Sequence, residues 1–364
     1  MVRPADQPPR DRARAFCARF GLGLPVLMAP MAGASPPALA AAVAEAGGLG
    51  ACGALPLDQA GIAGWAQRFR QMSGGCFQIN LWVPDDPPPR DAAQEAALAD
   101  FLARFGPRPG LPPEPMLPDF DAQFAALLAA RPAVASSIMG LFRPDQVAAL
   151  RTAGIAWLAT ATTLAEALAA QEAGADAVIA QGGEAGGHRG SFTPQAAAQA
   201  AVGAMALIPA LAEALDVPVI AAGAIACPRS AAAALVLGAS AVMPGTVLLR
   251  CAEAGISPVW ADALARARPE DSILTRAFTG RPARALRNTY ILAAEAADAP
   301  VPAPYPVQRH LTEAMRRQAS EAGDFGCLYA LAGQAAGRGG ITETPEGAGA
   351  FTRRLWRETE ALLV

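Results

Sequence analysis

The sequence predicts an α/β protein built as a (β/α)8 barrel, and two observations support this prediction. First, short apolar runs alternate with alanine-rich helical stretches from residue 25 to residue 243, in eight units. Second, 53% of the 364 residues are hydrophobic and only 17% are charged, which excludes a disordered chain and requires a large buried core. A doubly wound sheet is the alternative, but it usually has about six strands or fewer. No GxGxxG sequence follows the first predicted strand either.

The predicted strands are almost continuously apolar, as expected for parallel strands that are buried on both faces. They cover residues 25–30, 49–53, 76–83, 133–139, 156–160, 177–181, 218–222 and 241–243. Helices are predicted between and after them at residues 36–46, 57–72, 120–130, 144–153, 163–173, 194–215 and 229–237. Ser35 is the expected N-cap of the first helix, and Pro209 is expected to interrupt the helix at 194–215.

Two segments depart from this alternation of strands and helices. Residues 84–118 contain ten prolines around a short predicted helix at 91–105, which indicates an insertion after the third strand that acts as a lid or a contact surface. Residues 255–364 lose the alternation: an extended stretch is predicted at 274–287, and helices at 305–319 and 329–336. We therefore expect an N-terminal arm (1–22), a barrel (23–254) and a C-terminal helical cap (255–364) that covers the active site.

Several classes of protein are excluded by composition. The net charge of −3 without blocks of like charge argues against binding to nucleic acid or to a membrane surface. All 29 basic residues are arginine, which excludes P-loop nucleotide hydrolases and enzymes that form a Schiff base through lysine. With only His188 and His310, a zinc site built on several histidines is not expected, and we predict no metal site. His310 is expected on an exposed helix.

The expected location is the bacterial cytoplasm. Six cysteines are spread along the chain without a CxxC pair, which favours buried thiols in a reducing compartment. The first 20 residues carry charges throughout and have no apolar core of a signal peptide. The uncharged run at 195–212 contains glutamine and proline and is interpreted as a buried barrel helix, not as a membrane span.

The strongest candidate for a functional loop is QGGEAGGHRG at residues 181–190, directly after a predicted strand. In an α/β barrel, the loops after the strands build the active site. Five glycines in ten residues let the backbone approach a ligand closely, and the loop carries one carboxylate, Glu184, and one imidazole, His188. An imidazole can act as a base or a hydrogen-bond donor near neutral pH.

Other strand ends add candidate ligand contacts. The backbone N–H groups of Gly223, Ala224, Gly245 and Thr246 follow the last two strands, where barrels often bind phosphate. Residues 29–33 (APMAG) are small or flexible and suit the face of an aromatic ring. Asn80 is a polar residue within an apolar strand and needs a partner, and Tyr305 is an aromatic residue that the cap could place over the site.

These segments together resemble the nitronate monooxygenase family, formerly called 2-nitropropane dioxygenases. The resemblance extends from about residue 23 to residue 338 and rests on the order and spacing of seven motifs. They are MAPMAG (28–33), AGGLG (46–50), INLW (79–82), QGGEAGGHRG (181–190), PVIAAGAI (218–225), LGASAVMPGT (237–246) and PYPVQ (304–308).

The resemblance implies a TIM barrel that binds FMN without a covalent link. By the resemblance, the flavin is lined by Met28, Ala29, Pro30 and Met31, and its ring or ribityl chain is contacted by Asn80 and Gln181. The resemblance also implies that the chain and phosphate of the flavin are held by Gly186, Gly187, Gly223, Ala224, Met243, Pro244, Gly245 and Thr246. Tyr305 and Glu184 are candidates for substrate binding. His188 matches the catalytic histidine, which takes the α-proton of a nitroalkane or donates a hydrogen bond to the anionic nitronate.

The implied reaction is the FMN-dependent oxidation of a nitronate or nitroalkane by O2 to a carbonyl compound and nitrite. The alternative is an NAD(P)H-dependent flavin reductase, similar to enoyl-ACP reductases or quinone reductases, because such barrels share the EAGGH sequence. Ala224 stands where the family more often has glycine, so its methyl group could crowd the phosphate loop. The expected partners are a small nitronate or nitroalkane and O2, and the sequence leaves a homodimer open.

Overall fold

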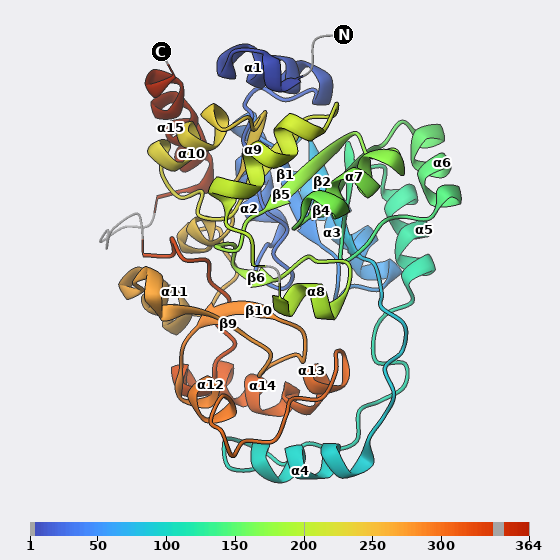
Figure 1. Cartoon of the computed structure of the whole chain (residues 1–364), viewed down its shortest axis with the longest axis vertical. Helices are drawn as coiled ribbons and strands as arrows, with labels where there is room; N and C mark the ends of the chain where they lie inside the picture. The colour runs from blue at the N-terminus through green and yellow to red at the C-terminus, as the bar shows by residue number, and fades with distance from the viewer. Residues whose placement is uncertain (1–3, 200, 338–345, 364) are drawn as a thin grey trace.

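A computed structural model shows an α/β barrel with a cap at one end (Figure 1) and describes residues 4–199, 201–337 and 346–363. Seven parallel strands form one curved sheet in the order β1-β2-β3-β4-β5-β7-β8. The strands are β1 (Gly50–Gly53), β2 (Phe77–Trp82), β3 (Val134–Ile138), β4 (Ala156–Ala161), β5 (Ala177–Gln181), β7 (Val219–Ala222) and β8 (Ala241–Met243). Each of these strands was predicted, which confirms the α/β barrel.

The first predicted strand, at 25–30, closes the sheet into a barrel. It forms two isolated parallel bridges, Val26 with Val242 of β8 and Leu27 with Leu49 next to β1. The amide of Leu27 donates to the carbonyl of Val242 at 2.9 Å, and the amide of Met28 donates to the carbonyl of Leu49 at 2.9 Å. Five backbone hydrogen bonds in all join the segment to its neighbours, three on the β8 side and two to Leu49. The segment therefore supplies the eighth side of the barrel.

Helices surround the sheet, and most begin and end near the predicted residues. They are α2 (Pro37–Glu45), α3 (Gln59–Met72), α5 (Phe120–Ala130), α6 (Pro144–Ala153), α7 (Leu164–Glu172), α8 (Pro194–Gln199), α9 (Ala204–Ala214) and α10 (Pro228–Val236). Side chains of Asp58, Asp119 and Thr163 accept hydrogen bonds from amides in the first turns of α3, α5 and α7.

The prediction that Pro209 interrupts the helix at 194–215 was wrong. Pro209 lies inside α9, and the described residues 201–203, just before α9, are not helical. The carboxylate of Glu184 accepts a hydrogen bond from the amide of Ala204, at 3.0–3.1 Å. This contact satisfies an N-terminal amide of α9, so the new helix begins at this point, before the proline.

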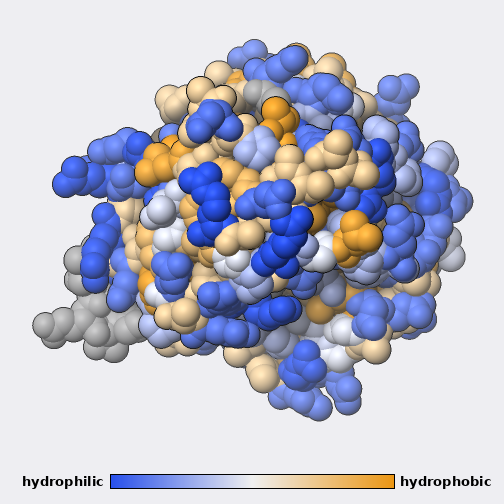
Figure 2. Space-filling model, turned by 90° about the horizontal axis from the view of Figure 1, so that it is seen from below, coloured by the Kyte–Doolittle hydropathy of each residue, from blue (hydrophilic) through white to orange (hydrophobic). Residues whose placement is uncertain are grey.

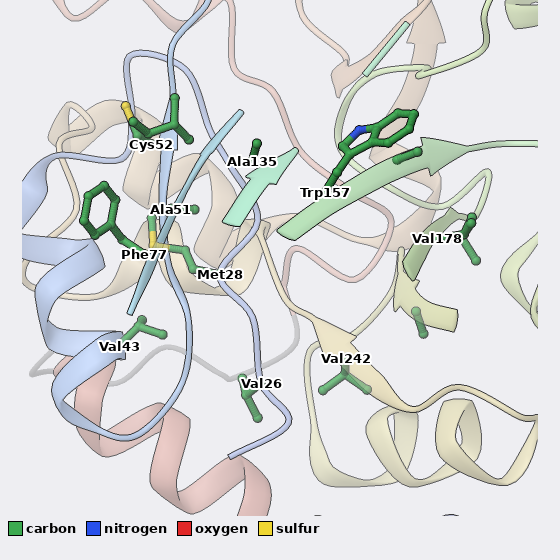
Figure 3. Packing of buried hydrophobic residues seen from close by; sticks show 14 of the residues in the cluster. Val26, Met28, Val43, Ala51, Cys52, Phe77, Ala135, Trp157, Val178 and Val242 are labelled. Atoms are coloured by element: carbon green, nitrogen blue, oxygen red, sulfur yellow. The ribbon is translucent and has the colours of Figure 1, made fainter. Parts of the chain in front are cut away.

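The core follows the alternation of side chains along each strand. Inside the barrel, one cluster contains Leu27, Leu49, Val134, Leu158 and Ile179, among others. Their sequence neighbours face the surrounding helices and form a second cluster, which includes Val26, Met28, Ala135, Trp157, Val178 and Val242 (Figure 3). Because both faces are buried, the strands read as continuous apolar runs in the sequence.

Helix α1 (Pro9–Phe20) lies across the end of the barrel opposite the cap (Figure 1). Phe16 and Phe20 join the cluster inside the barrel. The guanidinium group of Arg12 donates to the carbonyl of Ala239 at 3.0 Å and also to that of Leu235. The N-terminal arm thus plugs the amino ends of the strands.

The cap is a layer of helices and a small antiparallel sheet. Its helices are α11 (Pro258–Arg266), α12 (Thr289–Ala294), α13 (Val307–Leu311) and α14 (Glu313–Ala322), and its sheet has the order β6-β10-β9, with β6 (Gly187–His188), β9 (Ser272–Thr275) and β10 (Ala283–Leu286). The helix predicted at 329–336 was wrong: Leu331 is extended and bridges antiparallel to Ala285, because the open side of β10 offers backbone partners there. The last helix, α15 (Ala348–Leu362), packs on α10 and α2.

The proline-rich insertion lies along the cap. Its helix α4 (Ala92–Leu102) supplies Leu98 and Leu102 to a cluster with cap residues such as Phe278 and Tyr290. No residue from 84 to 118, all of which the structure describes, lines the cavity discussed below. The insertion is therefore a contact surface that holds the cap from outside.

His310 belongs to this contact between insertion and cap. Its Nε2 atom donates to the carbonyl of Met116 at 2.6 Å, and the side chain is only 11% exposed. The expectation of an exposed histidine was wrong, because the insertion covers α13. Seen from the cap end, hydrophilic and hydrophobic residues are mixed over the surface (Figure 2).

Replacing Leu102 with alanine tests whether the insertion holds the cap. Leu102 is fully buried in the cluster between α4 and the cap, so Leu102→Ala should lower the free energy of unfolding by about 2–5 kcal/mol. Leu111→Ala, in the same insertion but 88% exposed, is the control and should change it by less than about 0.5 kcal/mol. Equal effects in urea unfolding would contradict the packing described here.

Candidate active site

A cavity of about 550 Å³ lies at the carboxyl ends of the barrel strands, beneath the cap. Its walls come from the loops after the strands and from cap residues between 255 and 335. The volume is within the range of about 300–1,000 Å³ found for small-molecule sites. This end of an α/β barrel is where active sites lie.

Most of the residues predicted from the sequence meet in this cavity. Those that line it are Ala29, Pro30, Met31, Asn80, Gln181, Gly186, Gly187, His188, Gly223, Ala224, Met243, Gly245 and Thr246. They come from five strands and the loops that follow them (the segment at 25–30, β2, β5, β7 and β8), which the barrel brings to one end.

Four predicted residues lie elsewhere. Met28 points outward into the core between strands and helices, because the alternation along the segment turns Ala29 toward the barrel axis instead. The carbonyl of Pro244 accepts a hydrogen bond from the amide of Ala29. Glu184 caps α9. Tyr305 stacks on the ring of Trp82, with centroids 4.9 Å apart and planes at 10°, and its hydroxyl is buried.

Backbone amides form a polar end of the cavity. The N–H groups of Gly223, Ala224, Gly245 and Thr246 have no acceptor among the described residues. Ala224 has φ of +56°, in the left-handed region that favours glycine. This conformation explains why glycine suits the position, and holding alanine there indicates local strain at a ligand site.

Gly186 stands where two barrel loops meet the cap. A Cβ atom at this position would lie 2.5 Å from the amide nitrogen of Gly333 and 2.9 Å from Oγ1 of Thr246. The amide of Gly333 donates to that same Oγ1 at 2.9 Å. The hydroxyl hydrogen of Thr246 therefore stays available for a ligand.

Gln181 and Asn80 are already held by protein. Gln181 donates from Nε2 to the carbonyl of His188 at 3.0 Å, and its Oε1 accepts from the amide of Gly190 at 2.7 Å. Asn80 donates from Nδ2 to Oγ of Ser136 at 3.0 Å, which leaves its carbonyl oxygen for a ligand. Gln181 therefore shapes the loop that carries His188.

His188 lies on the two-residue strand β6, which pairs antiparallel with β10 of the cap. Its Nε2 atom is 2.9 Å from Oγ1 of Thr279 and 3.5 Å from the hydroxyl of Tyr329. The imidazole and the ring of Trp82 pack in a T-shaped arrangement, with centroids 4.8 Å apart and planes at 74°. The ring is thus fixed from three sides by one strand and two parts of the cap.

The charge state of His188 is set by its surroundings. Burial of the ring, with smaller contributions from the positive charges of Arg281, Arg309 and Arg316, lowers the pKa of His188 from 6.5 to about 3. The imidazole is therefore neutral at physiological pH. An anion in the cavity would act against the arginines and raise this pKa.

Several lining residues were not predicted as site residues. Trp82 was part of the INLW motif but was not assigned a role. Thr279 lies in the stretch at 274–287, which was predicted to be extended and was given no functional role. Arg309, Arg316 and Tyr329 come from the cap, whose sequence carries no period that points to the barrel. Nothing in the local sequence indicates that these side chains meet His188.

The residues that the structure describes lack both a metal-binding cluster and a membrane-spanning helix. Among them there is no cluster of three or more histidine, cysteine, aspartate or glutamate side chains suited to a metal ion. In the same part of the chain, every helix is too short or too polar to cross a bilayer.

Comparisons with known proteins agree with this site. The model of the family described as nitronate monooxygenase matches residues 16–344. Nitronate monooxygenases of Paraburkholderia phytofirmans and Pseudomonas aeruginosa are each 38% identical to this chain, covering 89% and 88% of it and 90% and 93% of their own lengths.

Solved structures give the same result. The nitroalkane oxidase of Streptomyces ansochromogenes superposes with a TM-score of 0.85 at 36% identity, over 93% of this chain and 96% of that one. FabK of Thermotoga maritima superposes with a TM-score of 0.74 at 25% identity, over 96% of each chain.

Fold and site together define an oxidoreductase of the α/β-barrel class. The chain belongs to the nitronate monooxygenase family.

The neutral state of His188 predicts a pH dependence of stability. Since the folded pKa of about 3 lies below the unfolded value of 6.5, the unfolded chain binds the extra proton between these values. Stability from this group is therefore complete above pH 6.5 and is lost as the pH falls toward 3, by up to about 1.4 kcal/mol per pH unit.

Urea unfolding of the native protein and of His188→Gln between pH 4 and 7 measures this effect. The variant should lose less stability on acidification, because the carboxylates titrate in both proteins and only the histidine differs. Parallel curves would show that the imidazole is not held neutral by the fold.

Proposed function

We propose that the chain catalyses FMN-dependent oxidation of alkyl nitronates or nitroalkanes by O2 to a carbonyl compound and nitrite. One observation carries this proposal: a single cavity joins a cluster of free backbone amides to a buried neutral histidine. Membership of the nitronate monooxygenase family supports it. FMN, when bound, would supply the one-electron and oxygen chemistry, while the protein binds, orients and excludes water.

The polar end of the cavity fits the phosphate of FMN. Four free N–H groups and the Thr246 hydroxyl offer neutral donors to an anion, without a lysine or arginine. Gly223 has φ of +110°, which only glycine adopts easily, and this turn exposes the following amides. Gly223, Ala224, Gly245 and Thr246 would thus hold the phosphate.

The apolar side of the cavity fits the flavin ring. Ala29, Pro30 and Met31 offer a flat surface of small and flexible side chains. The free carbonyl oxygen of Asn80 is an acceptor for a ring N–H or a ribityl hydroxyl. Gln181 lies beside it and keeps the His188 loop in place.

His188 would act as the base that takes the α-proton of a nitroalkane, or as a hydrogen-bond donor to the nitronate. The lowered pKa makes it a weak base when the cavity is empty of anions. Preformed nitronates, which need no deprotonation, should therefore be better substrates than neutral nitroalkanes.

The cap favours an anionic substrate. Arg309 and Arg316 line the cavity, and the Arg316 guanidinium lies 5.7 Å from the centroid of the Tyr329 ring. Positive charge in an enclosed site attracts a nitronate more strongly than a neutral nitroalkane.

Removing the imidazole tests the role of His188. If it is the base, His188→Ala should lower kcat/KM for neutral nitroalkanes by about 10²–10⁴-fold and should affect preformed nitronates much less. Nitrite release in air measures both. Equal losses on both substrates would rule out the base and leave the hydrogen-bond role.

A charge placed at the amide cluster tests the phosphate site. Gly245→Asp should release FMN, because its carboxylate would repel the phosphate across the free amides. Gly245→Ala is the control, since its Cβ atom would meet only Ala29 Cβ at 3.1 Å and Met31 Sδ at 3.8 Å. The flavin absorbance of the purified proteins measures how much FMN each variant retains. If Gly245→Asp retains all of its flavin, the phosphate must bind elsewhere.

A second candidate is an NAD(P)H-dependent flavin reductase, similar to enoyl-ACP or quinone reductases. The observation in its favour is the shared barrel and cap of FabK, at 25% identity over 96% of each chain. Anaerobic mixing with NADPH separates the two functions. Rapid bleaching of the flavin without a nitronate would favour the reductase.

Two expectations stay predictions: the use of O2, and a homodimer, which the sequence left open.

A further inference from the structure

The hydroxyl of Thr279 is the meeting point of three polar groups. Its Oγ1 atom is 2.9 Å from Nε2 of His188 and 3.1 Å from the carbonyl oxygen of Arg281. The hydroxyl of Tyr329 is the third polar group here and lies 3.5 Å from the same Nε2 atom of His188. A threonine hydroxyl has one hydrogen to donate and two lone pairs that accept.

The single hydrogen of Thr279 belongs to the carbonyl of Arg281. Arg281 has no exposed surface, and among the described residues no other group donates to its carbonyl oxygen. Leaving a buried carbonyl without a donor would destabilise the fold. A carbonyl cannot donate in return, so the direction of this bond is certain.

Arg281 itself is firmly held. Its guanidinium group pairs with Asp85 at the start of the insertion and donates to the carbonyl of Ser191. Asp85 is one contact between the insertion and the surroundings of the site, and Leu117, which packs against the cluster of Trp82 and Tyr305, is another. The carbonyl that orients Thr279 is therefore part of a fixed structure.

With its hydrogen committed, Thr279 can only accept from His188. The Nε2 atom of the neutral imidazole must carry the hydrogen, and Nδ1 must carry the lone pair. The hydroxyl oxygen of Tyr329, 3.5 Å from the same Nε2 atom, can then only accept from this hydrogen. Nδ1 makes no hydrogen bond among the described residues, and His188 lines the cavity.

We propose that Thr279 is a positioning residue that fixes the tautomer of His188, so that Nδ1 is the proton acceptor offered to the substrate. This rests on the proposed function and selects between its two roles for His188. In the neutral state Nδ1 accepts and does not donate. The C–H bond of a nitroalkane breaks, its proton goes to Nδ1, and the electron pair stays on the substrate as the nitronate.

The chain offers a direct test because it has only two histidines. The flavin-loaded protein is labelled with ¹⁵N-histidine, and long-range ¹H–¹⁵N NMR identifies which ring nitrogen carries hydrogen. His310→Gln leaves one imidazole and assigns the signals. The wild-type protein should show His188 with hydrogen on Nε2, and hydrogen on Nδ1 would overturn the proposal.

Three variants test the role of the hydroxyl. Thr279→Val keeps the shape but removes the acceptor, and should shift the His188 population toward the Nδ1–H tautomer. Thr279→Ser should keep the wild-type tautomer. Tyr329→Phe removes a neighbouring hydroxyl but leaves the hydrogen bond from Thr279 to the carbonyl of Arg281 in place. This variant should also keep the wild-type tautomer of His188. A Thr279→Val protein that stays fully in the Nε2–H tautomer would overturn the proposal.

Activity gives a second readout. Thr279→Val should lower kcat for neutral nitroalkanes by about 10- to 100-fold, with preformed nitronates less affected and Thr279→Ser close to wild type. The tautomer signals do not depend on turnover. If they are as expected and no nitrite forms, the proposed function fails while the assignment of Thr279 stands. If Thr279→Val does not fold, the wild-type and Thr279→Ser spectra still decide.

Discussion

The short antiparallel pairing of β6 with β10 is the constraint on which the site depends. It joins only His188 with Ala283 and Gly187 with Arg284. Yet it connects the glycine-rich loop after β5 to the cap, and so places His188 between Trp82 and Thr279. Two residues suffice because Gln181 and Arg189 hold the loop on either side.

A neutral imidazole follows from this enclosure. Desolvation disfavours the charged form, and three arginines around the ring act in the same direction. Arg309 and Arg316 line the cavity and would attract an anion, which would raise the pKa of the imidazole. A neutral ligand would not offset the arginine charges and would leave the low pKa of His188 as it is.

The proline-rich insertion gives the cap its rigidity. It supplies the leucines of α4 to the buried cluster of the cap, the carbonyl that His310 binds, and the carboxylate that pairs with Arg281. The cap forms most of this buried cluster itself, with residues such as Phe278, Tyr290 and Met315. Apolar contacts from the insertion complete that core, and one ion pair extends the insertion to the site.

The sequence by itself determined the barrel and most of the cavity. Apolar strands of the right length, separated by capped helices, allow few architectures, and loops at the carboxyl ends of parallel strands must meet. Gly223, Gly245 and His188 could be assigned to the site for that reason. Met28 could have been excluded by the alternation of side chains, which turns neighbouring residues to opposite faces.

Only the tertiary structure decided what surrounds His188. Thr279, Tyr329 and Arg316 are distant in the sequence from His188. Their approach depends on the pairing of β6 with β10 and on the packing of the insertion against the cap. Such contacts arise from long-range burial of side chains, which local propensity does not encode. The barrel determines where His188 lies, but the cap determines the charge state and the tautomer of its imidazole.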